Sequence, residues 1–117
     1  MERALLVTIQ MKRERDNWSL EDTAYELEEL AVSSGAQVVD NITCVCDKPT
    51  ANFLIGSGKV EELAGAAQEK YSDTVIFSQD LSGTQQRNLE EVIGKKTIDR
   101  TQLILDIFAR HAKSPEG

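Results

Sequence analysis

The sequence ALLVTI, at residues 4–9, decides the class of fold because it is apolar at nearly every position. A strand with one face in water alternates apolar and polar residues, whereas a strand buried on both faces is a continuous apolar run. A second run of this kind, DTVIFS at residues 73–78, is β-branched, aromatic and unbroken. Both runs therefore predict buried strands of a sheet that is covered on both faces.

Helical patterns alternate with these strand patterns. The predicted helices are marked by three kinds of signal: apolar residues three and four positions apart, a capping side chain such as serine or aspartate at the start, and a glycine at the end. Each helix shows at least one of them. The second helix is marked by Val60, Leu63, Ala64 and Ala67. The residues that start or stop the other helices are Ser19, Asp22 and Gly35 for the first, Ser82, Gln85 and Gly94 for the third, and Asp99 or Thr101 for the last.

Two further strands complete the pattern. Residues 36–46, AQVVDNITCVC, form a long strand whose polar Asp40 and Asn41 indicate an edge, and residues 96–98 form a short one. Strands separated by helices return to the same direction through right-handed crossovers. We therefore expect an α/β fold in which a small four-stranded, mainly parallel sheet is flanked by helices. Residues 1–112 form this single domain, and residues 113–117 begin a connection.

The charge of the chain limits its partners. The chain has thirteen Lys and Arg residues and twenty Asp and Glu residues, which give a net charge of −7. This charge argues against nucleic-acid binding by the domain as a whole. Any RNA contact is expected to be local.

The chain has no apolar run of the roughly 18 residues that a membrane span needs, and its first residues lack the features of a secretory signal. We expect a cytoplasmic protein, with peripheral association at a membrane left open.

The two cysteines do not indicate a metal site. Cys44 and Cys46 lie two residues apart in a predicted strand, so both point to the same face of the sheet. Zinc needs about four ligands, and the only histidine, His111, is far away in the sequence. We expect reduced structural thiols and no bound metal.

The stretch FLIGSGKVEEL, at residues 53–63, looks like a phosphate-binding loop but lacks two of its requirements. The pattern GxxxxGK[ST] needs a glycine where Phe53 stands and a hydroxyl where Val60 stands. Two interpretations stay open: the glycines allow a tight entry into the helix, or Gly56, Ser57, Gly58 and Lys59 hold an anion or an RNA phosphate. No pair of nucleophile and base is apparent, so we predict no catalytic residue.

Ligands of parallel sheets usually meet the carboxyl ends of the strands. This edge is expected to gather residues 10–18, the GSGK turn, residues 78–80 and residues 99–100.

The last helix is unusual, because in LILDIFA (103–109) only Asp106 is polar and apolar residues cover about two thirds of the circumference. Either this helix is central to the core, or part of it is covered by protein beyond Gly117 or by another subunit.

Five phrases resemble, in order and spacing, the N-terminal domain of the HflX GTPases. They are ERALLV (2–7), ELEEL (26–30), IGSGKVEEL (55–63), NLEE (88–91) and DRTQLILDIFA (99–109). The resemblance implies the N-terminal domain of a ribosome-associated GTPase whose helical linker and G domain lie in cis outside this chain. GTP and Mg²⁺ are then expected for the full-length protein, and no cofactor for this fragment.

The resemblance also implies a partner and a role. HflX-type proteins bind the large ribosomal subunit, contact its rRNA near the peptidyl transferase centre, and separate stalled or idle ribosomes under stress. The rRNA or anion contacts expected here are Gly56, Ser57, Gly58, Lys59, Arg100, Arg110 and Lys113. The chain departs from the family at 43–47, TCVCD, where relatives commonly carry a basic stretch. The competing interpretations are a stand-alone nucleotide-binding module and a protein-interaction module.

Overall fold

Four parallel strands and four helices alternate in the computed structural model of this chain, which describes residues 2–11 and 19–112. The predicted α/β class is confirmed. The elements are β1 (Arg3–Met11), α1 (Leu20–Ser33), β2 (Gln37–Cys46), α2 (Ser57–Glu69), β3 (Thr74–Phe77), α3 (Gly83–Ile93), β4 (Lys96–Asp99) and α4 (Arg100–Ala112). Among the described residues, no helix has the length and hydropathy that crossing a membrane would require.

β1 is a central strand of the sheet, whose order is β2-β1-β3-β4. It pairs in parallel with β2 on one side and with β3 on the other, so that Leu6 lies between Asn41 and Ile76. Residues 4–9 are all buried, as the apolar run ALLVTI predicts. β3 is buried at all four of its positions for the same reason.

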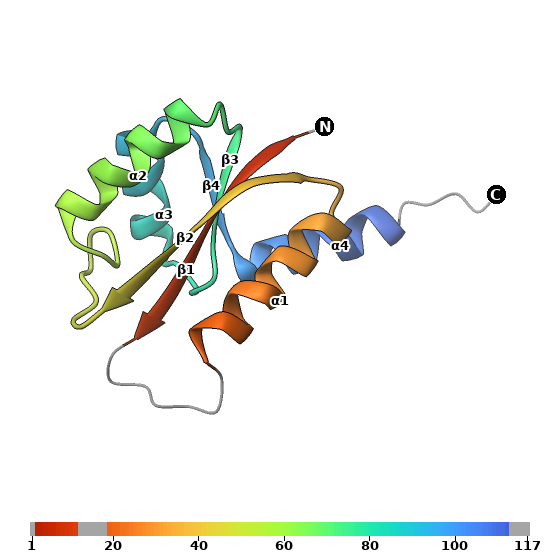
Figure 1. The fold of residues 1–117 in the computed structure, drawn as a ribbon, viewed down its shortest axis with the longest axis horizontal. Coiled ribbons are helices and arrows are strands. Elements are labelled where there is room, and N and C mark those ends of the chain that lie inside the picture. The colour runs from red at the N-terminus through yellow and green to blue at the C-terminus, as the bar shows by residue number, and fades with distance from the viewer. Residues whose placement is uncertain (1, 12–18, 113–117) are drawn as a thin grey trace.

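The helices cover both faces of the sheet in pairs (Figure 1). α2 and α3 lie over one face, and α1 and α4 lie over the other. The side chains of β1 alternate between two cores, because successive residues of a strand point to opposite faces. Leu5 and Val7 pack with residues of α2 and α3, whereas Leu6 packs with Leu27 of α1 and Leu103 of α4.

The ends of the helices follow the capping signals of the sequence. The Ser19 side chain accepts a hydrogen bond from the Asp22 backbone N–H (3.0 Å), and Ser82 forms a reciprocal capping box with Gln85. Gly94 ends α3 with a φ of 78°, a left-handed conformation in which glycine avoids the steric cost of a Cβ atom. At the start of α4 the Asp99 carboxylate accepts from the Gln102 N–H (2.9 Å), so Asp99 is the residue that caps this helix.

β2 is an outer strand of the sheet, as its polar residues indicate. Its register with β1 shifts once, because Ala4 pairs with Val38 and Leu5 pairs with Asp40, which leaves Val39 as an extra residue. Beyond this bulge, the Asn41 side chain accepts a hydrogen bond from the Thr8 hydroxyl (2.7 Å). The sequence predicts the edge, and the bulge is a feature that the sequence pattern does not show.

The burial of the two cores leads to a prediction on matched phenylalanines. Phe77 is 0% exposed in β3, and Phe108 is 65% exposed in α4. We expect Phe77→Ala to lower the free energy of unfolding by about 3 to 5 kcal/mol, because it leaves a cavity between well-packed side chains. Phe108→Ala should lower it by less than about 0.5 kcal/mol in the same chain. Urea unfolding measures both, and equal losses would contradict this arrangement of the core.

Candidate functional site

The carboxyl ends of the four strands define the edge at which ligands of parallel sheets usually bind. Three of the segments expected at this edge are present there: the turn before α2, residues 78–80 after β3, and residues 99–100 at the end of β4. Of residues 10–18, only Gln10 and Met11 are described, and Met11 pairs with Cys46 at the end of β2. Residues 12–18 lie outside the described part.

A short tight turn holds the entrance of α2 in place. Thr50 and Leu54 form an antiparallel bridge, and Leu54 has a φ of 73° although it is not glycine. Its side chain is only 5% exposed, so burial offsets the cost of the left-handed backbone. From α3, Gln85 donates to the Thr50 carbonyl oxygen (2.8 Å) and Asn88 donates to the Asn52 carbonyl oxygen (3.1 Å). The N-terminus of α2 is therefore fixed from two sides.

The first turn of α2 presents backbone N–H groups without a side-chain cap. Gly56 is the N-cap residue, and its carbonyl oxygen accepts from the N–H groups of Lys59 (3.0 Å) and Val60 (3.1 Å). Unlike Ser19 and Ser82, Gly56 has no side chain that could accept from the first N–H groups of its helix. Such an end carries partial positive charge and attracts anions.

The glycines of this turn are not required by the domain itself. Neither Gly56 nor Gly58 has a φ in the left-handed region, and a Cβ atom added at either position would meet nothing within 4 Å. The interpretation that these glycines allow a tight entry into the helix is therefore wrong on steric grounds. What the glycines do provide is an unobstructed approach to the backbone from outside.

A pocket of about 360 Å³ opens beside this turn, between the end of β2 and the start of α2. Lys59 lies in its wall and forms an ion pair with Glu62 (2.9 Å). The hydrogen bond to Glu62 raises the pKa of Lys59 above its ordinary value, so the ammonium group stays charged at neutral pH. The pocket is lined by Cys44, Val45, Cys46, Asp47, Lys48, Ile55, Gly56 and Lys59.

The two cysteines are buried on the side of the sheet that α2 covers, and both are free thiols. Burial raises the pKa of Cys44, which the nearby Lys59 partly counteracts, and burial likewise raises the pKa of Cys46. The Cys46 thiol donates to the Leu54 carbonyl oxygen (3.4 Å) and so supports the turn before α2. The expectation of reduced structural thiols on one face is confirmed.

Polar side chains that follow β3 and β4 form hydrogen bonds within the chain. The Ser78 hydroxyl accepts from the Ile9 N–H (2.8 Å), and Asp80 accepts from the Thr101 hydroxyl (2.8 Å). Both carboxylate oxygens of Asp99 are also engaged, by the backbone N–H groups of Leu81 (2.9 Å) and Gln102 (2.9 Å). Within residues 2–11 and 19–112, no three His, Cys, Asp or Glu side chains are grouped to hold a metal ion.

The basic residues expected to contact phosphate do not lie together. Arg100 makes a two-pronged ion pair with Glu26 of α1 (3.0 and 3.1 Å), and this contact raises the pKa of Arg100. Arg100 follows β4 and Lys59 lies beside β2, and these outer strands are three strand spacings apart, about 14 Å. The two residues also belong to opposite faces of the sheet.

Arg110 lies near the amino ends of the strands, at the edge of the sheet opposite to Lys59. It lines a small pocket with Thr74 and Lys96, the first residues of β3 and β4, and with Glu2, which precedes β1. Lys113 lies outside the described residues. The structure therefore brings together Gly56, Ser57, Gly58 and Lys59, and it separates Arg100 and Arg110 from them.

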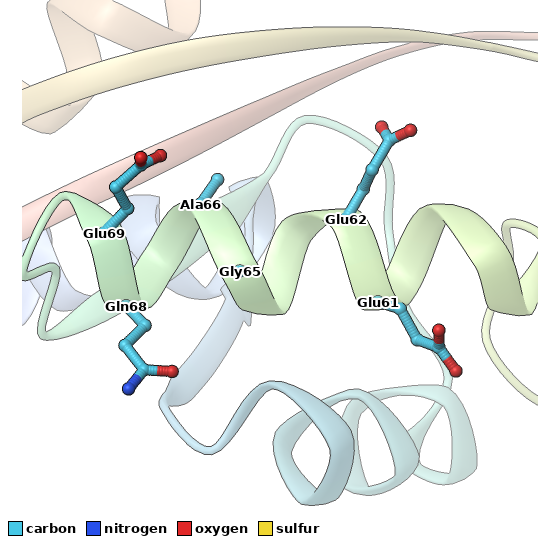
Figure 2. A pocket seen from close by; sticks show the side chains of 6 residues that line it. All are labelled: Glu61, Glu62, Gly65, Ala66, Gln68 and Glu69. Carbon is cyan, nitrogen blue, oxygen red and sulfur yellow. The ribbon is translucent and has the colours of Figure 1, made fainter.

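The outer surface of α2 is acidic (Figure 2). A shallow hollow lies over Gly65, with Glu61 and Gln68 on one side of the helix and Glu62, Ala66 and Glu69 on the other. A polyanion such as RNA is repelled by three carboxylates in this place. An anion is attracted only at the first backbone N–H groups of the helix, because the carboxylates of Glu61 and Glu62 follow within its first two turns.

Comparison with known proteins identifies the family. Residues 21–109 match the family model described as GTP-binding GTPase N-terminal. The GTPase HflX of Caldanaerobacter subterraneus subsp. tengcongensis is 45% identical over 116 residues, which are 99% of this chain and 26% of that protein. The chain belongs to the family of HflX N-terminal domains. The GTPase HflX of Escherichia coli (strain K12) is 38% identical, over 99% of this chain and 26% of its own length.

This chain thus spans about a quarter of the length of these curated relatives. A solved structure described as a complex of SsGBP and GDP superimposes with a TM-score of 0.72. It is 22% identical to this chain and covers 99% of it, while the chain covers 31% of that structure. At this identity the likeness shows the fold alone.

The open surroundings of Gly58 lead to a prediction on stability. Gly58→Ala should raise the free energy of unfolding by about 0.4 to 1 kcal/mol, because alanine restricts the unfolded chain and clashes with nothing in the folded one. The matched control is Gly94→Ala, which should lower it by about 1 kcal/mol or more, since the φ of Gly94 is 78°. Urea unfolding of both variants is the measurement, and destabilisation by Gly58→Ala would restore the tight-entry interpretation.

The buried thiols lead to a prediction on pH. In the unfolded chain the two thiols have the ordinary pKa of 9.0 and lose their protons around that pH. In the folded chain the raised pKa values keep Cys44 and Cys46 protonated at the same pH. The unfolded state then binds fewer protons, so the free energy of unfolding falls as pH rises from about 8 to about 10. Replacing both cysteines by serine should reduce this slope. Native thiols should also react with iodoacetamide at least about tenfold more slowly than in urea, and equal rates would contradict their burial.

Proposed function

We propose that this chain is the N-terminal, ribosome-binding domain of an HflX-type GTPase that splits or rescues ribosomes under stress. The observation that carries the proposal is the match of residues 21–109 to the GTPase N-terminal family, together with relatives named GTPase HflX that align over the whole chain. The partner in this proposal is the large ribosomal subunit and its rRNA. In this proposal the protein acts in the cytoplasm.

The start of α2 supports a contact with an RNA phosphate. Phosphate oxygens accept hydrogen bonds from free N–H groups at helix N-termini and pair with lysine ammonium groups. Gly56, Ser57 and Gly58 supply the backbone, and Lys59 supplies the charge. The absence of any steric need for Gly56 and Gly58 supports close approach by a group from outside the chain.

The electrostatics limit this contact to a small area. The carboxylates of Glu61, Glu62 and Glu69 follow within the same helix, and the chain as a whole carries a net charge of −7. We infer that the isolated domain binds the subunit weakly and with a strong dependence on salt. Arg100, Arg110 and Lys113 would add separate contacts, because Arg100 and Arg110 lie at other places on the domain.

GTP and Mg²⁺ belong to another part of the full-length protein in this proposal. The residues present here do not fit them, because the GSGK turn lacks the hydroxyl after its lysine, and both Asp99 carboxylate oxygens and one Asp80 oxygen accept hydrogen bonds within the chain. No catalytic step is assigned to this domain. Its helical linker and G domain would follow in cis.

Binding to purified large ribosomal subunits tests the proposal. The chain should cosediment with the subunits at about 50 mM salt and be lost at about 200 mM. Lys59→Ala should weaken the binding and reduce the slope of its salt dependence by about 1, because one phosphate contact is removed. Gly58→Ala, which should stabilise the chain, should also weaken the binding because a methyl group then stands in front of the backbone.

Two controls separate these effects from a general change of charge or stability. Arg87→Ala removes the same charge as Lys59→Ala from an exposed position on α3, and Gly65→Ala adds a methyl group elsewhere on α2. If Lys59→Ala and Arg87→Ala bind equally, Lys59 has no role in the contact. Micromolar binding of ATP or GTP by the chain, measured by calorimetry, would favour the stand-alone nucleotide-binding module instead.

A further inference from the structure

α4 uses only part of its apolar surface within this domain. Leu103 is buried and Ile107 packs against the same core. Leu105 and Phe108 are 60% and 65% exposed, and they lie three residues apart, so both are on the outer face of the helix. Ile104, four residues before Phe108, is half-buried beside them. The helix is therefore not central to the core of this chain.

We propose that Leu105 and Phe108 are a docking surface for the segment of polypeptide that follows this domain in HflX-type proteins. The relatives extend well beyond the matched part, which is 26–27% of their length and N-terminal in its family. Phe108 lies four residues before Ala112, the last residue of α4, and four residues of a helix rise about 6 Å. A following segment therefore starts within about one helical turn of this surface.

The small size of the surface favours an occupant in the same chain over a second copy. A stable complex between separate proteins buries about 800 Å² on each partner, which two side chains and a half-buried third do not provide. A tethered segment needs less area, because its effective concentration reaches the millimolar range. The net charge of −7 also opposes the approach of a second copy.

The exposed charges of α1 and α4 are of both signs, so the apolar residues describe the occupant. α1 lies beside α4 on the same face of the sheet (Figure 1) and exposes Glu21, Asp22 and Glu29. On α4, Asp106 and Arg110 are exposed as well. The complementary segment has an apolar stripe for Leu105 and Phe108. This inference rests on membership of the family and not on ribosome binding.

Amide hydrogen exchange tests the proposal. Exchange of the amides of residues 103–109 is measured in the 117-residue chain and in the full-length protein that carries it. We expect at least tenfold slower exchange in the full-length protein. Leu105→Ser with Phe108→Ser should abolish this difference in the full-length protein, while leaving the urea midpoint of the short chain within error because both side chains are exposed there.

The control is Val92→Ser, which changes an exposed apolar residue of α3 on the other face of the sheet and should leave the protection of α4 unchanged. Equal exchange of residues 103–109 in the short and the full-length protein would overturn the proposal. Protection that appears in the short chain as its concentration rises would overturn it too, since the surface would then belong to a second copy.

Discussion

The pairing of β1 on both sides is the constraint on which the rest of the structure depends. Because β2 and β3 take up the backbone hydrogen bonds of β1, and helices cover both of its faces, residues 4–9 are shielded from water in every direction. A strand in this position must be apolar throughout. The alternation of its side chains then determines which helix meets which core, so that α2 and α3 pack on Leu5 and Val7 while α1 and α4 pack on Leu6.

This arrangement separates two surfaces that the sequence alone places close together. The order β2-β1-β3-β4 puts the end of β2, with the bare start of α2, at one side of the sheet, and the end of β4, with Arg100, at the other. Arg100 is held by Glu26 and joins α4 to α1. The anion contact proposed for the start of α2 and the protein contact proposed for α4 thus lie on opposite faces of the sheet.

The elements of the fold could be predicted because their signals are local. The caps at Ser19 and Ser82 and the left-handed Gly94 act within a few residues, and the buried strands are visible as apolar runs. The second helix begins at Ser57, before the apolar residue Val60 that marked it in the sequence. The spacing of apolar residues along a helix shows which face is buried, but it does not show a first turn that is polar.

The composition of the candidate site could be predicted only in part. The GSGK turn and the carboxyl edge follow from residue type and chain order, but the strand order, the pairing of Arg100 with Glu26 and the distant position of Arg110 depend on tertiary packing. The positive φ of Leu54 also has no local signal, because leucine avoids that conformation unless burial compensates. Whether Gly56 and Gly58 are sterically needed depends on which residues surround them in the folded chain, and no local pattern shows this.

The bulge at Val39 has a consequence for the behaviour of the domain during its synthesis. β2 is ten residues long and lies at the edge of the sheet, where a long regular strand invites pairing with other chains and aggregation. The extra residue interrupts the regular spacing of backbone groups, and the Asp40 carboxylate beside it lies 3.9 Å from the Lys70 ammonium group. An N-terminal domain leaves the ribosome before the rest of its protein, and an interrupted, charged edge lowers the risk that nascent copies join through their sheets.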